Sequence, residues 1–125
     1  ATAAQFKVVQ QLVAKAGELV IATDADREGE MIAREIIDLC GYRGPIQRLW
    51  LSALNDASIR KALRALKPSA ETLPLYFSAL ARSRADWLIG MNLSRLFTLL
   101  GRQAGYAGVL SVGRVQTPTL KLVVD

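Results

Sequence analysis

Apolar positions in the first part of the chain change from a helical to an extended periodicity. Helical spacing in the opening segment predicts an amphipathic helix that ends at Gly17. The repeat is carried by Phe6, Val9, Leu12, Val13 and Ala16. The short apolar run 19–23 follows, bounded by glycine and acids, and predicts a buried strand. A helix followed by a strand favours an α/β fold.

The same alternation continues after the first strand. Apolar positions from Ile32 to Cys40 predict a second helix that ends at Gly41. The run 46–51 predicts a second strand, parallel to the first across a right-handed crossover. From Asn55, a suitable N-cap residue, a third amphipathic helix is expected. This order describes half of an open α/β sheet.

The remainder of the chain follows helical spacing. Pro68 ends the third helix, and we expect Thr72 to cap a long helix with Pro74 in its first turn. One stripe of that helix carries the small residues Gly90 and Ser94, where another backbone can approach. The predicted organisation is therefore a partial parallel sheet followed by a mainly helical lobe, with residues 1–66 in the first part and 67–125 in the second.

Composition and charge narrow the function classes. The chain has 125 residues, 51% apolar and 22% charged, which suits one domain or two small lobes and excludes disorder as its main state. The formal net charge is +5, and residues 76–125 carry most of the excess. A polyanionic partner is therefore expected to dock on the second half.

Several reaction types are excluded by what the sequence lacks. With no His and one Cys, Cys40, it supplies no Cys/His zinc site, no Ser-His-Asp triad and no internal disulfide. A lone Cys fits a reducing cytosol, and we see no secretion leader. The apolar stretches are short and broken by charge, so no membrane span is expected.

The most informative motif is the acidic stretch 24–30, where a strand gives way to a helix. In an extended segment, residues two apart point the same way, so Asp24, Asp26 and Glu28 can converge. Such carboxylates suit Mg²⁺, which takes oxygen ligands and keeps several waters. A neighbouring guanidinium, Arg27, suits a phosphate. The alternative is a solvated acidic loop that caps the next helix.

Two further segments carry residues suited to a nucleic-acid strand. Segment 111–119 combines hydroxyls, a glycine, Arg114 and Gln116, although a solvated loop explains the same composition. On the long helix, Arg82 and Asp86 share one face, and Arg84 and Arg95 align on roughly the opposite face. An intrahelical ion pair is the simpler reading of Arg82 with Asp86, and Trp87 is more often a core residue than a base-stacking platform.

Taken together, the three segments resemble one family, the type IA DNA topoisomerases, in their topoisomerase III form. Segment 24–36 resembles the second half of the Toprim domain, 81–95 resembles a helix of the next domain, and 110–120 resembles the DNA-contacting motif of that domain. The resemblance implies an α/β fold, a partial Toprim domain with a Rossmann-like parallel sheet, followed by a mainly α-helical DNA-binding lobe.

The resemblance also implies an activity and a set of site residues. A type IA enzyme is ATP-independent and Mg²⁺-dependent, and it cuts one DNA strand through a 5′-phosphotyrosine, passes a strand and reseals the break. Asp24 and Asp26 would be Mg²⁺ ligands, and Glu28 would assist as a ligand or through water. Arg82 and Asp86 would position the single strand. The groove that holds the strand would be lined by Arg95, Ser111, Val112, Gly113, Arg114, Val115 and Gln116.

Family features outside these segments are missing from the sequence. The first Toprim strand, with its Glu and Lys, is not seen, and Tyr42, Tyr76 and Tyr106 lie outside any matching motif. We therefore expect an internal fragment that is inactive alone, in the cytoplasm and at the nucleoid if the source is bacterial. Protein partners stay unknown. The alternatives are another Toprim enzyme, a primase or an OLD-type nuclease, and a non-catalytic single-strand DNA-binding module.

Overall fold

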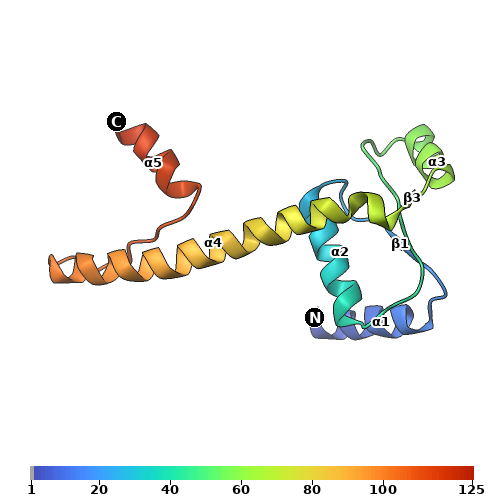
Figure 1. Ribbon diagram of the computed structural model, residues 1–125, viewed down its shortest axis with the longest axis horizontal. Helices are drawn as coiled ribbons and strands as arrows, with labels where there is room; N and C mark the ends of the chain where they lie inside the picture. The colour runs from blue at the N-terminus through green and yellow to red at the C-terminus, as the bar shows by residue number, and fades with distance from the viewer. Residues whose placement is uncertain (1) are drawn as a thin grey trace. The chain divides into compact units, whose positions relative to one another are not determined.

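The computed structural model describes residues 2–125, which form two compact units that divide between Leu80 and Ala81. Each unit is described by itself below. In chain order the elements are α1 (Thr2–Lys15), β1 (Leu19–Ile21), α2 (Arg27–Leu39), β2 (Ile46–Arg48), α3 (Asp56–Arg64), β3 (Lys67–Pro68), α4 (Ser69–Gln103) and α5 (Gln116–Val124) (Figure 1). The expected fold class, a small α/β part followed by a mainly helical region, is confirmed.

The first unit is built on a three-stranded sheet in the order β1-β2-β3. Strands β1 and β2 are parallel, as predicted, with Leu19 opposite Ile46 and Ile21 opposite Arg48. Strand β3 runs antiparallel to β2. The sequence reading missed β3, because it took Pro68 only as the end of a helix; helix α3 already ends at Arg64, and the next residues pair with β2.

The first residues of the helices are not always those that the apolar pattern predicts, because capping side chains also decide where a helix begins. Helix α2 begins at Arg27, ahead of its first apolar position, because Asp26 caps it. Asn55 caps α3, as predicted. The expectation that Thr72 caps the long helix is wrong: α4 begins at Ser69, and the Thr72 hydroxyl donates to the Ser69 carbonyl at 3.3 Å.

The earlier start of α4 also moves its proline. Pro74 lies inside the helix rather than in its first turn, because β3 delivers the chain directly to Ser69. A proline this near the beginning removes one helical N–H donor. The helix nevertheless continues as far as Gln103, so Pro74 does not end it.

The core of the first unit combines a few apolar side chains with buried charge. Its buried hydrophobic residues are Val13, Ile21, Ala33, Leu49 and Ala79. The largest fully buried side chains, however, are those of Arg48 and Glu30, both at 0% exposure. Buried ionic groups need partners to offset the loss of water. The centre of this unit is therefore organised around an ion pair.

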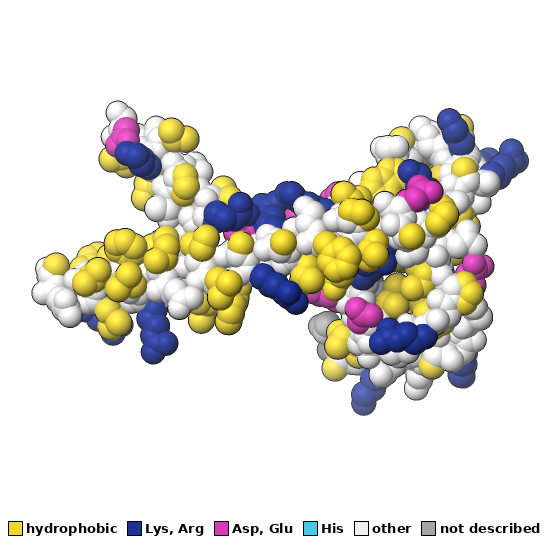
Figure 2. Space-filling model, viewed as in Figure 1, with side chains coloured by type: hydrophobic (Ala, Val, Ile, Leu, Met, Phe, Trp, Pro, Cys, Tyr) yellow, Lys and Arg dark blue, Asp and Glu magenta, His cyan; other side chains and the backbone are white. Residues whose placement is uncertain are grey.

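The second unit consists of the end of α4, the segment 104–115 and α5. Hydrophobic side chains are exposed along its part of α4 in Figure 2. Trp87, weighed above as a core residue, is 64% exposed. In the part of the chain that the structure describes, no helix is both long and apolar enough to cross a membrane.

Candidate functional site

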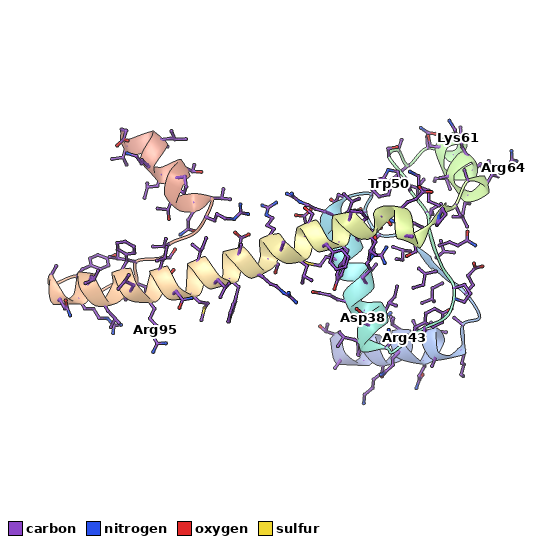
Figure 3. All side chains as sticks on the ribbon, in the orientation of Figure 1. Asp38, Arg43, Trp50, Lys61, Arg64 and Arg95 are labelled. Carbon is purple, nitrogen blue, oxygen red and sulfur yellow. The ribbon has the colours of Figure 1, made fainter. Side chains whose placement is uncertain are left out.

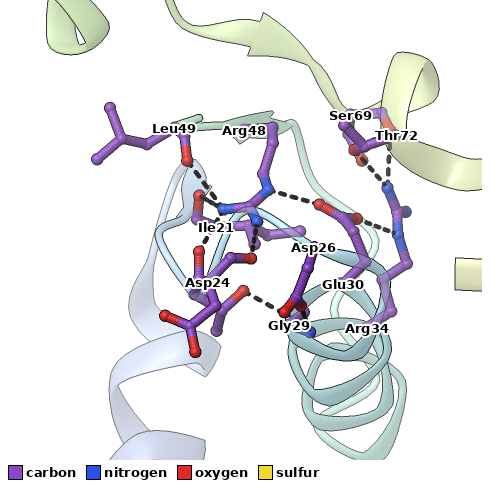
Figure 4. Close-up of polar contacts among 11 residues, drawn as sticks. Ile21, Asp24, Asp26, Gly29, Glu30, Arg34, Arg48, Leu49, Ser69 and Thr72 are labelled. Carbon is purple, nitrogen blue, oxygen red and sulfur yellow. Dashed lines mark hydrogen bonds and ion pairs between the residues drawn. The ribbon is translucent and has the colours of Figure 1, made fainter. Parts of the chain in front are cut away.

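Arg48 holds the backbone of the turn between β1 and α2. Its Nη1 atom donates to the carbonyls of Ile21, Thr23 and Leu49 at 3.2, 2.8 and 2.8 Å, and its Nη2 atom donates to the Asp24 carbonyl at 2.5 Å (Figure 4). A guanidinium presents several donors in one plane, which suits a cluster of carbonyls. One buried side chain thus positions the backbone that carries Asp24.

Glu30 balances the charge of Arg48 and extends the network. Its Oε1 atom lies 2.5 Å from Arg48 Nε, as an ion pair without an aligned hydrogen bond, and its Oε2 atom accepts from Arg34 Nε at 2.9 Å. Arg34 Nη2 donates in turn to the Ser69 carbonyl at 2.7 Å. Through these contacts α2, β2 and the first residues of α4 share one polar network in the first unit.

The same turn is closed from the helix side by Gly29. Its N–H donates to Asp26 Oδ1 at 2.7 Å, and its carbonyl accepts from Thr23 Oγ1 at 2.8 Å. A Cβ at this position would lie 2.3 Å from the Asp24 carbonyl oxygen. Because that neighbour is backbone, only glycine lets α2 approach the end of β1 this closely.

The three predicted metal ligands differ in the backbone conformation that carries them. Asp24, Asp26 and Glu28 are exposed, but Glu28 lies in the first turn of α2 rather than in an extended segment, so the expected two-residue alternation does not reach it. Glu28 also accepts from Arg27 Nε at 3.1 Å. Across the described residues, no three His, Cys, Asp or Glu side chains gather as a metal-holding group.

Asp24 and Asp26 still fit the donor chemistry of Mg²⁺. Within residues 2–125 no hydrogen bond or ion pair engages the Asp24 carboxylate, and Asp26 uses Oδ1 for Gly29. Both follow β1 at its carboxyl end, where ligands of open α/β sheets bind. Two carboxylates with free oxygens suit an ion that keeps several waters.

In the second unit, two hydroxyls of α4 hold the returning chain. Ser94 Oγ accepts from the Val112 N–H at 2.8 Å and contacts the Val112 carbonyl at 3.2 Å. Thr98 Oγ1 accepts from the Leu110 N–H at 3.0 Å. Four residues of a helix rise about as far as two residues of an extended segment. The spacing from Ser94 to Thr98 is therefore about equal to the spacing from Val112 to Leu110. The expected backbone approach at Ser94 is confirmed.

Segment 111–116 is closed by its own polar groups. Gln116 Nε2 donates to the Ser111 carbonyl at 3.1 Å and to its hydroxyl oxygen at 2.5 Å, and the Gly113 N–H donates to Thr117 Oγ1 at 3.0 Å. The Ser111 hydroxyl keeps its own proton for a further acceptor. These bonds shape the loop that carries Arg114.

Asp86 orients Arg114. Its Oδ1 accepts from Arg114 Nε at 2.6 Å, and its Oδ2 lies 3.7 Å from Arg82 Nε. The hydrogen bond and charge of Arg114, together with the charge of Arg82, lower the pKa of Asp86, and Asp86 raises that of Arg114. All three side chains are partly exposed. The predicted pairing of Arg82 with Asp86 is present, and Arg114 joins it.

Asp86 and segment 112–116 line an open groove of about 700 Å³ in the second unit. Its other lining residues are Gly90, Thr119, Leu120 and Val123. Of the predicted strand-holding residues, Val112, Gly113, Arg114, Val115 and Gln116 line this groove. Arg95 and Ser111 do not, although Ser111 bonds to Gln116. The structure therefore brings together most, not all, of the predicted set.

Sequence reasoning missed the residues that support these sites. Glu30 was read only as part of an acidic stretch, and Arg48 as one position of a strand. An arginine inside a short apolar run was the available signal, since a buried guanidinium requires acceptors. Thr98 gave no signal of its own, because its role depends on where the chain returns to α4.

Comparisons with known proteins agree with this arrangement. Residues 1–54 match a family model described as Toprim domain, and residues 71–125 match one described as DNA topoisomerase. The chain is therefore similar, in order, to a Toprim domain and to part of a DNA topoisomerase.

The similar proteins are named DNA topoisomerase 3. The chain is 52% identical to that of Vibrio cholerae over 124 residues, 96% of this chain and 19% of the relative. It is 45% identical to those of Salmonella typhimurium and Staphylococcus aureus, over 96% and 98% of this chain and 19% and 17% of theirs. The resemblance to topoisomerase III is confirmed, and the chain spans less than a fifth of these curated relatives.

Proposed function

We propose that this chain is the part of a type IA DNA topoisomerase, of the topoisomerase III kind, that binds Mg²⁺ and holds a single DNA strand. The whole enzyme opens one strand through a 5′-phosphotyrosine, passes another strand and reseals the break without ATP. We assign residues 1–66 to the Toprim part and 67–125 to the DNA-binding lobe, so the start of the lobe, residues 67–80, lies in the first compact unit. The cytoplasm, or the nucleoid in a bacterium, is the location that this activity requires.

The observation that carries the proposal is the orientation of Arg114 in the groove. Asp86 engages only Nε of Arg114, and in the described residues the two terminal nitrogens of Arg114 have no partner. Those two nitrogens are the pair that binds phosphate in a fork. Asp86 is therefore a positioning residue, and Arg114 is the group that contacts the strand. Arg82 and Arg95 add positive charge along the same helix.

Mg²⁺ would be held by the carboxylates of Asp24 and Asp26, with Glu28 assisting through water. A bound Mg²⁺ neutralises the charge of a phosphate group. The match to a Toprim domain supports this assignment. Arg48 contributes indirectly, because its hydrogen bond to the Asp24 carbonyl fixes the backbone from which the Asp24 side chain extends.

The first test is single-strand DNA binding by the chain, followed by fluorescence anisotropy of a labelled oligonucleotide at several salt concentrations. Arg114→Ala is expected to weaken binding and to lower the salt slope by about 0.7, the value for one phosphate contact on a single strand. Arg43→Ala is the matched control, since it removes an equal charge and breaks an exposed ion pair with Asp38. Equal slopes for the two variants would refute the proposal.

The second test concerns the metal. Calorimetric titration with Mg²⁺ is expected to show binding that Asp24→Asn and Asp26→Asn each weaken strongly. Glu35→Gln, an exposed carboxylate on α2, is the control. Binding that is indifferent to both aspartates, with DNA affinity unchanged by Mg²⁺, supports a non-catalytic single-strand-binding module instead. We expect no covalent DNA adduct on the chain alone, and one detected on a denaturing gel would contradict this assignment.

A further inference from the structure

A second pocket lies in the first unit, and none of residues 24–30 lines it. It has a volume of about 290 Å³ and lies where the segment after β2 meets α3 and β3. It is lined by Trp50, Leu51, Ser52, Ser58, Lys61, Ala62, Ala65 and Lys67. We propose that this pocket binds one nucleotide of a single DNA strand, its base against Trp50 and its phosphate against Lys61 and Lys67. The identity of the strand as DNA rests on the function proposed above.

The charges in this pocket favour an anion. Its lining includes two exposed lysines and no acid. In the described chain, neither Lys61 nor Lys67 forms an ion pair, and the hydroxyls of Ser52 and Ser58 have no hydrogen-bond partner. Lysine ammonium and serine hydroxyl groups are common donors to phosphate oxygens. The pocket therefore offers two cations and two hydroxyls to one anionic group.

Trp50 is held in place before any ligand arrives. The guanidinium carbon of Arg48 lies 5.1 Å from the centroid of its ring, and Lys67 Nζ lies 5.5 Å from it. Arg48 is buried and fixed by carbonyls and Glu30, so the ring rests on an immobile cation. Lys67 is exposed, so its ammonium can turn from the ring to a phosphate without disturbing the core.

Size and chemistry select a single-stranded ligand. The volume is near the lower end of the roughly 300–1,000 Å³ of small-ligand pockets, which suits one nucleotide unit. A base can stack on an aromatic ring only when its face is free, as in single strands. In Figure 3, Trp50 lies beside α3, which carries Lys61 and also Arg64, a residue that does not line the pocket.

The experiment uses Trp50 as the reporter. Trp87→Phe removes the other tryptophan, which is 64% exposed and therefore tolerant of replacement. Titration of this variant with an oligothymidylate is expected to quench Trp50 emission to saturation. Adding Lys61→Gln is expected to weaken binding and to lower its salt slope by about 0.7. Arg64→Gln, on the same helix with the same charge change, is expected to leave both nearly unchanged.

The outcomes separate this pocket from the function proposed above. If anisotropy shows strand binding that depends on Arg114 while Trp50 emission is unchanged, the pocket proposal fails and the proposed function stands. Equal effects of Lys61→Gln and Arg64→Gln overturn it as well. Quenching by inorganic phosphate alone, at the same concentration of phosphate groups, would show a free-anion site and overturn strand recognition. Absence of any strand binding overturns both proposals.

Discussion

The buried pair of Glu30 and Arg48 gives the sharpest prediction about stability. Glu30→Gln keeps the shape of the side chain but leaves the Arg48 charge buried without its counter-ion. Breaking a buried ion pair costs about 3–5 kcal/mol. Arg48 keeps four carbonyl acceptors, at 2.5–3.2 Å, so we expect a loss near the lower end, about 3 kcal/mol. That is a large fraction of the roughly 5–15 kcal/mol that stabilises a typical domain.

The assay is urea denaturation followed by circular dichroism and by Trp50 fluorescence in the Trp87→Phe background. Glu35→Gln is the matched control, because it makes the same substitution at an exposed position of α2. Surface changes of this kind stay within about 0.5 kcal/mol. Arg48→Met is expected to cost more than Glu30→Gln, since Thr23 and Asp24 then lose the donor to their carbonyls. Equal free energies of unfolding for Glu30→Gln and Glu35→Gln would refute the reasoning.

Two further predictions test the turn and the groove. Gly29→Ala is expected to destabilise the chain by about 1–3 kcal/mol in the same denaturation assay, because its Cβ would lie 2.3 Å from the Asp24 carbonyl oxygen. Gly17→Ala is the neutral control, since a Cβ at that position would have no atom within 4 Å. The pKa of Asp86 lies below its ordinary value, so its ion pair with Arg114 stabilises the fold at pH values above that ordinary value. This stabilisation is lost as the pH falls through the lowered pKa. In Arg114→Gln, the pKa of Asp86 is expected to rise toward its ordinary value, as measured by carbon NMR titration. An unchanged titration midpoint would contradict the assignment of the lowered pKa to Arg114.

Local sequence signals predicted much of the fold. The parallel pairing of β1 with β2 and the capping role of Asn55 followed from apolar runs and a short polar side chain. These features depend on residues close in the chain, so pattern and propensity are sufficient. Strand β3 was missed because two residues carry no periodicity, and its pairing depends entirely on β2.

The candidate site was predicted unevenly for the same reason. The motifs pointed to Asp24, Asp26 and Arg114, and among the residues that the structure describes, oxygens of the two aspartates and nitrogens of the arginine have no partner. Glu28 was grouped with the aspartates on the assumption of an extended backbone, but capping by Asp26 starts the helix before it. Whether a residue belongs to a site thus depended on where a helix begins.

The sequence by itself determined the class of fold, the order of most elements and the resemblance to topoisomerase III, since periodicity and motifs are properties of neighbouring residues. Only the tertiary structure decided that Arg48 supports the acidic turn and that Asp86 turns Arg114 into the groove. Both contacts join residues far apart in the chain. The free energy of such contacts depends on burial and on partner geometry, which exist only once the elements have packed.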